Sequence, residues 1–156
     1  MTNVTGKIGN NDVSILLGDI TRTGVDAVIV PEFQSGASYG GVGGAVARSG
    51  ALAGMEAYEQ YVRTNGKQDF GTVILTPSGG GKSSQLLHVV SVGSGKQYEF
   101  DTVRTCIFKA LEIAEQKGIN SIAAPALGTG IIGDLTSKLK FPPRKSKNLN
   151  SGKQIA

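Results

Sequence analysis

Two glycine-rich stretches are the parts of this sequence whose residues suggest chemistry. One covers residues 124–133, Ala-Pro-Ala-Leu-Gly-Thr-Gly-Ile-Ile-Gly, and the other is Gly40-Gly41-Val42-Gly43-Gly44. Glycine lets the backbone approach an anion closely, and the free N–H groups at the beginning of a helix point toward it. Each stretch stands between an apolar run and a segment with helical features. The sequence therefore predicts two turns that bind a ligand with two phosphates, or with a phosphate and a sugar.

Two nucleotide-binding motifs are present only in part. Gly128, Gly130 and Gly133 have the spacing of the dinucleotide fingerprint, but that motif requires a βαβ unit with an acidic residue about 20 positions further on. Only Asp134 is acidic after Gly133, which argues against a dinucleotide-dependent oxidoreductase. Residues 77–84 suggest a P-loop, yet a strand rather than a helix is predicted after them. We interpret them as a mobile connection between two strands.

Three further side chains have chemistry of their own. Asp19 follows a predicted strand, so its carboxylate can face a ligand, although a turn or cap role is the common alternative. His88 lies inside a predicted strand, and we interpret it as structural. Cys106 lies in a helical pattern and is expected to be buried. With one histidine and one cysteine in the chain, we expect no metal site.

Length and charge narrow the class of protein. The 156 residues suffice for one domain with its own core, and 39% of them are hydrophobic. No stretch approaches the ~20 apolar residues of a membrane span, so we expect a cytoplasmic protein without a membrane partner. All 12 acidic residues lie at or before Asp134, whereas six of the 16 basic residues follow it. Residues 1–136 thus carry 10 − 12 = −2 and residues 137–156 carry +6, which leaves nucleic acid open as a partner of the basic segment only.

The predicted elements alternate between strand and helix. Strands are expected at residues 4–8, 13–17, 25–30, 72–76, 86–92 and 119–124, and helices at 51–62 and 101–117. Pro31 is expected to end the third strand. Such alternation predicts a three-layer α/β/α domain whose ligand lies at the carboxyl ends of the strands. We assign residues 1–136 to this domain and residues 137–156 to a basic, flexible tail.

Taken together, these stretches resemble the macro domain family. The resemblance covers roughly residues 10–136 and lies in Gly18-Asp19-Ile20-Thr21, residues 25–30, residues 40–46, Leu87-His88-Val89-Val90 and residues 124–133, in that order. Members of this family bind ADP-ribose, and some hydrolyse ADP-ribosyl bonds or the 1″-phosphate of ADP-ribose. The resemblance implies an α/β/α fold with a mixed central sheet, ADP-ribose or an ADP-ribosylated protein as partner, and no cofactor.

The resemblance also implies a ligand-binding role for individual residues. Asp19 would bind the adenine amino group, with the Ile20 amide beside it. The distal ribose and a phosphate would face Gly40, Gly41, Val42 and Gly43, and the adenosine side would face Ser91 and Gly93. Backbone amides of Gly128, Thr129, Gly130, Ile131 and Ile132 would surround the diphosphate, which needs no arginine or lysine.

Three departures from the family pattern bear on catalysis and on the end of the domain. Many hydrolytic members have Asn-Ala-Ala-Asn where this chain has Val30-Pro31-Glu32-Phe33, and one branch has an acidic residue where this chain has Gly43. The last helix and strand of the family are replaced by the basic segment, so we expect the C-terminal elements to be incomplete or unusually built. A binding module is therefore favoured, with a hydrolase of the same fold as the alternative. Glu32 is the one nearby general-base candidate, and we interpret it as a solvated loop carboxylate.

Overall fold

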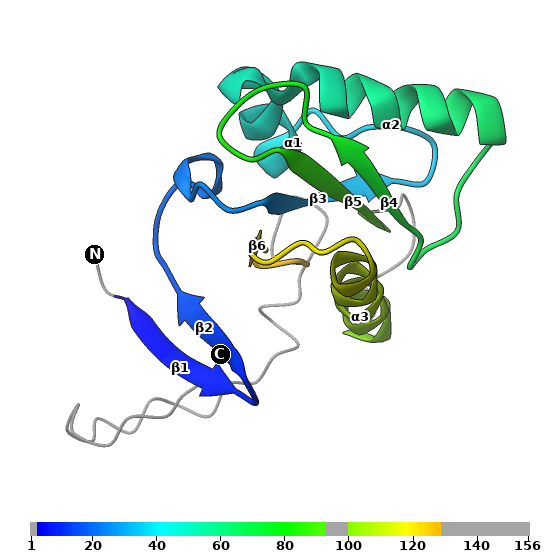
Figure 1. Cartoon of the computed structure of the whole chain (residues 1–156). Helices are drawn as coiled ribbons and strands as arrows, with labels where there is room; N and C mark the ends of the chain where they lie inside the picture. Colours follow the sequence, from blue (N-terminus) through cyan, green and yellow to red (C-terminus); the bar gives the residue numbers. More distant parts are fainter. Residues whose placement is uncertain (1–2, 93–99, 129–156) are drawn as a thin grey trace.

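The computed structural model describes residues 3–92 and 100–128 (Figure 1). In chain order the elements are β1 (Val4–Ile8), β2 (Asn11–Ile15), the 3-10 helix η1 (Ile20–Arg22), β3 (Ala27–Phe33), α1 (Gly41–Val46), the π-helical turn η2 (Ala47–Ala51), α2 (Leu52–Asn65), β4 (Val73–Pro77), β5 (Gln85–Val92), α3 (Phe100–Gln116) and β6 (Ile122–Ala123).

The main sheet has the strand order β4-β5-β3-β6. Strand β3 is parallel to both of its neighbours, and β4 is antiparallel to β5. Helices α1 and α2 cover one face of this sheet and α3 covers the other (Figure 1). The predicted three-layer fold with a mixed sheet is confirmed. Because β3, β5 and β6 are parallel, their carboxyl ends meet at one edge of the sheet, where ligands bind in such folds.

Alternation along the two central strands divides the core between the two faces. Ala27, Ile29, Leu87 and Val89 pack with Cys106 and Ala110 of α3, whereas Val28, Val30 and Leu86 pack with Val46 of α1 and Met55 of α2. Residues two apart in a strand point to the same face. Both sets are almost fully buried, because helices cover β3 and β5 on both sides.

Helix α2 presents its core residues at helical spacing, namely Met55, Tyr58 and Val62. It ends at Asn65, three residues later than predicted, and the next residue, Gly66, has φ of 82° and an N–H that donates to the Val62 carbonyl.

Strand β3 runs through Pro31 to Phe33, so the prediction that Pro31 ends it is wrong. The Ala27 N–H donates to the Ser121 carbonyl on the β6 side, and alternate residues of a parallel strand bond to the same neighbour. The nitrogen of Pro31 therefore also faces the β6 side. Strand β6 pairs with Ala27 and Val28, so within residues 3–92 and 100–128 no strand on that side requires an N–H from Pro31.

Two other connections differ from expectation. The two predicted strands before residue 18 are confirmed as β1 and β2, with β2 two residues earlier than predicted, but they form a two-stranded antiparallel sheet of their own. The connection between β4 and β5 was expected to be mobile, yet it packs closely: a Cβ at Gly80 would lie 2.1 Å from the Gly50 carbonyl oxygen.

The predicted tail, residues 137–156, lies outside the described residues. Within the described ranges, no helix is long and apolar enough to cross a membrane.

Candidate functional site

The first glycine-rich turn lies where the chain leaves β3 and begins α1. Gly40 caps the helix in an extended conformation and Gly41 has φ of 49°. Both residues are exposed, and a Cβ at Gly41 would have no atom within 4 Å. The backbone here is therefore open to solvent at the carboxyl edge of the sheet, as a phosphate-binding or ribose-binding turn requires.

The other two glycines of this turn have a different role. A Cβ at Gly43 would lie 1.7 Å from the Ser38 carbonyl oxygen, and one at Gly44 would lie 2.3 Å from that of Tyr39. Both glycines are buried. A side chain at Gly43 would therefore collide with the preceding loop and does not test ligand access. Gly41 is the position that tests ligand access.

Three side chains fix the loop between β3 and α1. The Ser38 N–H donates to Glu32 Oε2 at 2.6 Å, and the Ala37 N–H donates to Glu59 Oε2 at 2.8 Å. The Tyr58 hydroxyl donates to the Phe33 carbonyl at 2.8 Å. Two of these anchors come from α2 and one from β3, so helix and sheet together position the loop.

Glu32 belongs to a buried polar cluster, so its interpretation as a solvated loop carboxylate is wrong. Its Oε1 lies 2.7 Å from His88 Nδ1, and His88 Nε2 lies 2.9 Å from Thr76 Oγ1. The His88 ring stacks on Tyr58 at 4.9 Å between centroids. Burial raises the pKa of Glu32, and the hydrogen bond from His88 opposes this only in part. With 0% exposure, the carboxylate cannot reach a substrate as a general base.

No local pattern in the sequence reveals this cluster, because Glu32 and His88 are 56 positions apart. The parallel pairing of β3 with β5 sets Val30 opposite His88, which puts Glu32 within reach. One signal was available: Glu32 shares its strand face with Val28 and Val30. The structural role predicted for His88 is confirmed.

Asp19 and Ile20 lie beside the glycine turn. Asp19 caps η1, because its Oδ1 accepts from the Thr21 N–H at 2.9 Å and from Thr21 Oγ1 at 2.7 Å. These hydrogen bonds, that from the hydroxyl first, hold the pKa of Asp19 below its usual value. Its Oδ2 makes a loose, exposed pair with Arg22 at 3.5 Å, so that oxygen is available to an amino group. Ile20 and Val42 pack against the same apolar cluster.

The remaining predicted residues are described in part. Ser91 lies at the end of β5, beside the end of β3, and its buried Oγ has no hydrogen-bond partner among the residues that the structure describes. Gly128 has φ of 82° in a turn after β6. Gly93, Thr129, Gly130, Ile131 and Ile132 lie outside the described residues, so the second glycine-rich stretch remains a prediction.

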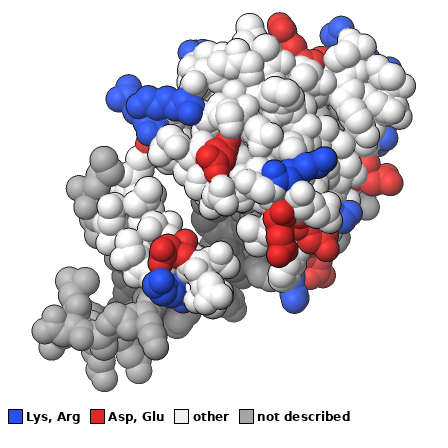
Figure 2. Space-filling view, in the orientation of Figure 1, with Lys and Arg blue, Asp and Glu red and all other residues white. Residues whose placement is uncertain are grey.

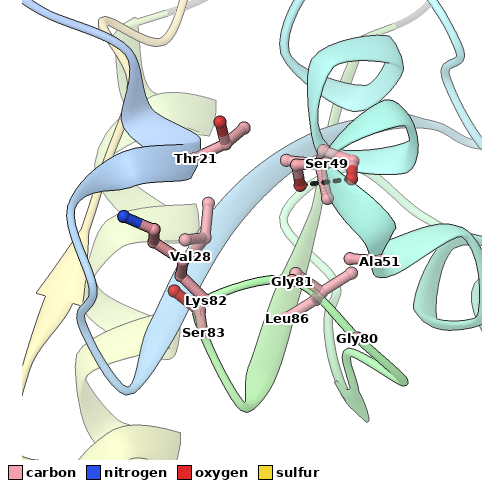
Figure 3. Close-up of a pocket in the computed structure, with 10 residues that line it drawn as sticks. Thr21, Val28, Ser49, Ala51, Gly80, Gly81, Lys82, Ser83 and Leu86 are labelled. Atoms are coloured by element: carbon pink, nitrogen blue, oxygen red, sulfur yellow. Dashed lines mark hydrogen bonds between the residues drawn. The ribbon is translucent and has the colours of Figure 1, made fainter.

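A small pocket lies away from this turn, between η1, η2 and the connection from β4 to β5 (Figure 3). Val28, Val46 and Leu86 give it apolar walls. Its Thr21 and Ser49 hydroxyls already donate, to Asp19 and to the Val46 carbonyl. Its lining includes none of those predicted ligand residues that the structure describes.

The fold agrees with comparisons to known proteins. The family model of the Macro domain matches residues 17–135, and the chain therefore belongs to the macro domain family. A Sulfolobus acidocaldarius protein is 34% identical over 126 residues, which cover 80% of this chain and 69% of that protein. The O-acetyl-ADP-ribose deacetylase of Escherichia fergusonii is 29% identical over 123 residues, which cover 78% of this chain and 70% of that protein. The Oceanobacillus iheyensis macrodomain solved with ADP has 25% identity and a TM-score of 0.75, with 85% of this chain and 72% of that chain covered.

Proposed function

We propose that this protein binds ADP-ribose, free or attached to a protein, at the edge formed by the Gly40–Gly41 turn and η1. The observation that carries the proposal is the open backbone at Gly41, in a chain of the macro domain family. The similar Oceanobacillus iheyensis macrodomain was solved with ADP, which supports a ligand with a diphosphate. Backbone amides would hold the phosphates, and Asp19 Oδ2 would accept from the adenine amino group.

The charged surface favours a small ligand over nucleic acid. On the face shown in Figure 2, lysine and arginine side chains are interspersed with aspartate and glutamate. Nucleic-acid binding relies on basic groups gathered along one face. A role of residues 137–156 in binding RNA stays a prediction, and a steep dependence of affinity on salt would mark it.

Hydrolysis is the second function worth testing, because a relative is an O-acetyl-ADP-ribose deacetylase. We expect slow turnover or none. Val30 and Phe33 cannot transfer a proton, and both Glu32 oxygens are engaged inside the protein. A general acid–base group contributes about 10²–10⁴-fold to a rate. Incubation with mono-ADP-ribosylated protein, ADP-ribose 1″-phosphate and O-acetyl-ADP-ribose tests this expectation, which rapid product release would contradict.

Calorimetric titration with ADP-ribose tests binding, with ADP, AMP and NAD as comparison ligands. Gly41→Ala should weaken binding about tenfold or more, because its methyl group enters the open space at the turn. Gly9→Ala is the matched control: Gly9 also has a positive φ, of 60°, and open space around it, but it lies between β1 and β2. Equal affinity of these two variants would remove the turn from the site.

The same titration tests the adenine contact. Asp19→Ala should weaken binding by about 1–3 kcal/mol, the usual loss of a hydrogen bond to a charged group. Asp12→Ala serves as control, because Asp12 is another exposed carboxylate and it pairs with Lys7 in the hairpin. Wild-type affinity in Asp19→Ala would leave Asp19 as a helix cap alone.

A further inference from the structure

We propose that Glu32 is a positioning residue: its buried carboxylate, held by His88, fixes the Ser38 amide and thereby the glycine turn that receives the ligand. This role rests on the proposed binding of ADP-ribose. It differs from a general-base role, because the carboxylate acts through the backbone and never touches the ligand.

The Glu32 carboxylate is held in one orientation by its neighbours. Oε1 is held by His88 Nδ1 at 2.7 Å, and Thr76 Oγ1 lies 2.9 Å from the other ring nitrogen. The Tyr58 ring covers the imidazole at an interplanar angle of 12°. Glu32, His88 and Tyr58 are each 0% exposed. A buried side chain with all of its partners in place has one orientation, because any other would leave polar groups unpaired.

The orientation of the Glu32 carboxylate determines the position of the loop. Oε2 accepts from the Ser38 N–H at 2.6 Å. The carbonyl of the same residue, Ser38, lies directly against Gly43, where even one Cβ would not fit. Gly40 and Gly41 lie in the chain between Ser38, which contacts Glu32, and Gly43, which contacts the Ser38 carbonyl. A shift of Ser38 would therefore move the turn.

The Glu32 anchor differs from the second carboxylate that holds the same loop. Glu59 accepts from the Ala37 N–H, but its side chain is 30% exposed and also pairs with Arg63. Water can replace that anchor. Water cannot replace the Glu32 anchor, because its surroundings exclude solvent and a hydrogen bond is stronger there. Fixing the turn in advance lowers the cost of ordering it when the ligand binds.

The experiment compares ADP-ribose affinity, by calorimetry, in wild type and four variants. Glu32→Ala should bind at least about tenfold more weakly, because the Ser38 amide loses its acceptor. Glu32→Gln should recover affinity to within about threefold, because its carbonyl can accept from Ser38 and its amide group can meet His88. Val89→Ala is the matched control, since it removes packing from the opposite face of β5. It should lower the melting temperature and leave affinity unchanged.

The fourth variant tests the same role if Glu32→Ala does not fold. The double change Glu32→Leu/His88→Leu removes the acceptor while filling the space with apolar atoms, so it should fold and still bind weakly. Hydrogen exchange at the Ser38 amide gives an independent measure: it should speed up in Glu32→Ala and in the double variant, but not in Val89→Ala.

Two outcomes would overturn this role alone. One is wild-type affinity in Glu32→Ala or in the double variant. The other is an equal loss of affinity in Val89→Ala, which would mean that general destabilisation is the cause. If the wild-type protein itself fails to bind ADP-ribose, the proposed function falls and this role falls with it.

Discussion

The two faces of the central sheet are built on different principles. Toward α3, the hydrophobic cluster consists of alkyl side chains and one thiol, Cys106. Toward α1 and α2, equally buried positions hold Glu32, His88 and Thr76 as well as aliphatic residues. Strands β3 and β5 contribute side chains to both faces. The two faces therefore differ because alternate residues of the same strands point to opposite sides of the sheet.

This difference shows what each face is for. An apolar core stabilises by burial and dispersion, which depend little on direction. A buried hydrogen-bonded cluster contributes less net stability for its volume, but it defines where its partners lie. The face with the cluster is also the face whose loop leads to the open glycine turn. Both faces thus contribute apolar burial, and the face toward α1 and α2 also positions the loop.

Breaking the buried pair should have the largest effect on stability. Glu32→Leu or His88→Leu alone should cost about 3–5 kcal/mol, because each leaves a buried polar group unpaired. The double variant should cost much less than the sum of the two. Urea denaturation of all three proteins measures this coupling. Additive losses would mean that the pair is no more than two separate contacts, and the contrast between the faces would weaken.

Truncation on the apolar face should have a comparable or somewhat smaller effect with a different signature. Leu87→Ala removes a fully buried side chain on the α3 side and should lower stability by about 2–5 kcal/mol. ADP-ribose affinity should not change while the protein remains folded. The contrast between the faces would be lost if affinity fell as far as it does in Glu32→Ala.

The smallest effect is a dependence of stability on pH that is confined to the polar face. Burial raises the pKa of Glu32 above its ordinary value of 4.5, so the carboxyl binds its proton more tightly in the folded protein. Its contribution is complete below that ordinary value and is lost as the pH rises through the folded pKa. The stability of wild type relative to Glu32→Gln should therefore decline from acid toward neutral pH. A constant or rising difference, measured by denaturation at several pH values, would contradict the cause given for the shift.

Local pattern predicted most of the fold. Helix α3 and strand β5 follow from periodicity and from continuous apolar runs, and Gly66 marks the end of α2 as a left-handed glycine should. The end of β3 at Pro31 was predicted wrongly, because the effect of a missing N–H depends on whether a neighbouring strand is present. That information lies in residues 122–123, far along the chain.

The glycine turn between β3 and α1 was predicted from the sequence, whereas the side chains that hold its loop were not. The glycine turn could be predicted because a cluster of glycines indicates backbone conformations that other residues rarely adopt. The distinction between Gly41, which faces open space, and Gly43, which faces the Ser38 carbonyl, depends on how the chain folds back on itself. The Glu32–His88 pair depends on strand register, which cannot be read from a single sequence.

The lone thiol of the apolar face has a consequence for chemical reactivity. Cys106 is fully buried, and burial raises its pKa to about 11. The thiolate is the species that reacts with alkylating agents, so at neutral pH the folded protein should be inert to them. Reaction must await an opening of α3 away from the sheet. The rate of alkylation of the native chain therefore reports how often that layer separates, without any introduced label.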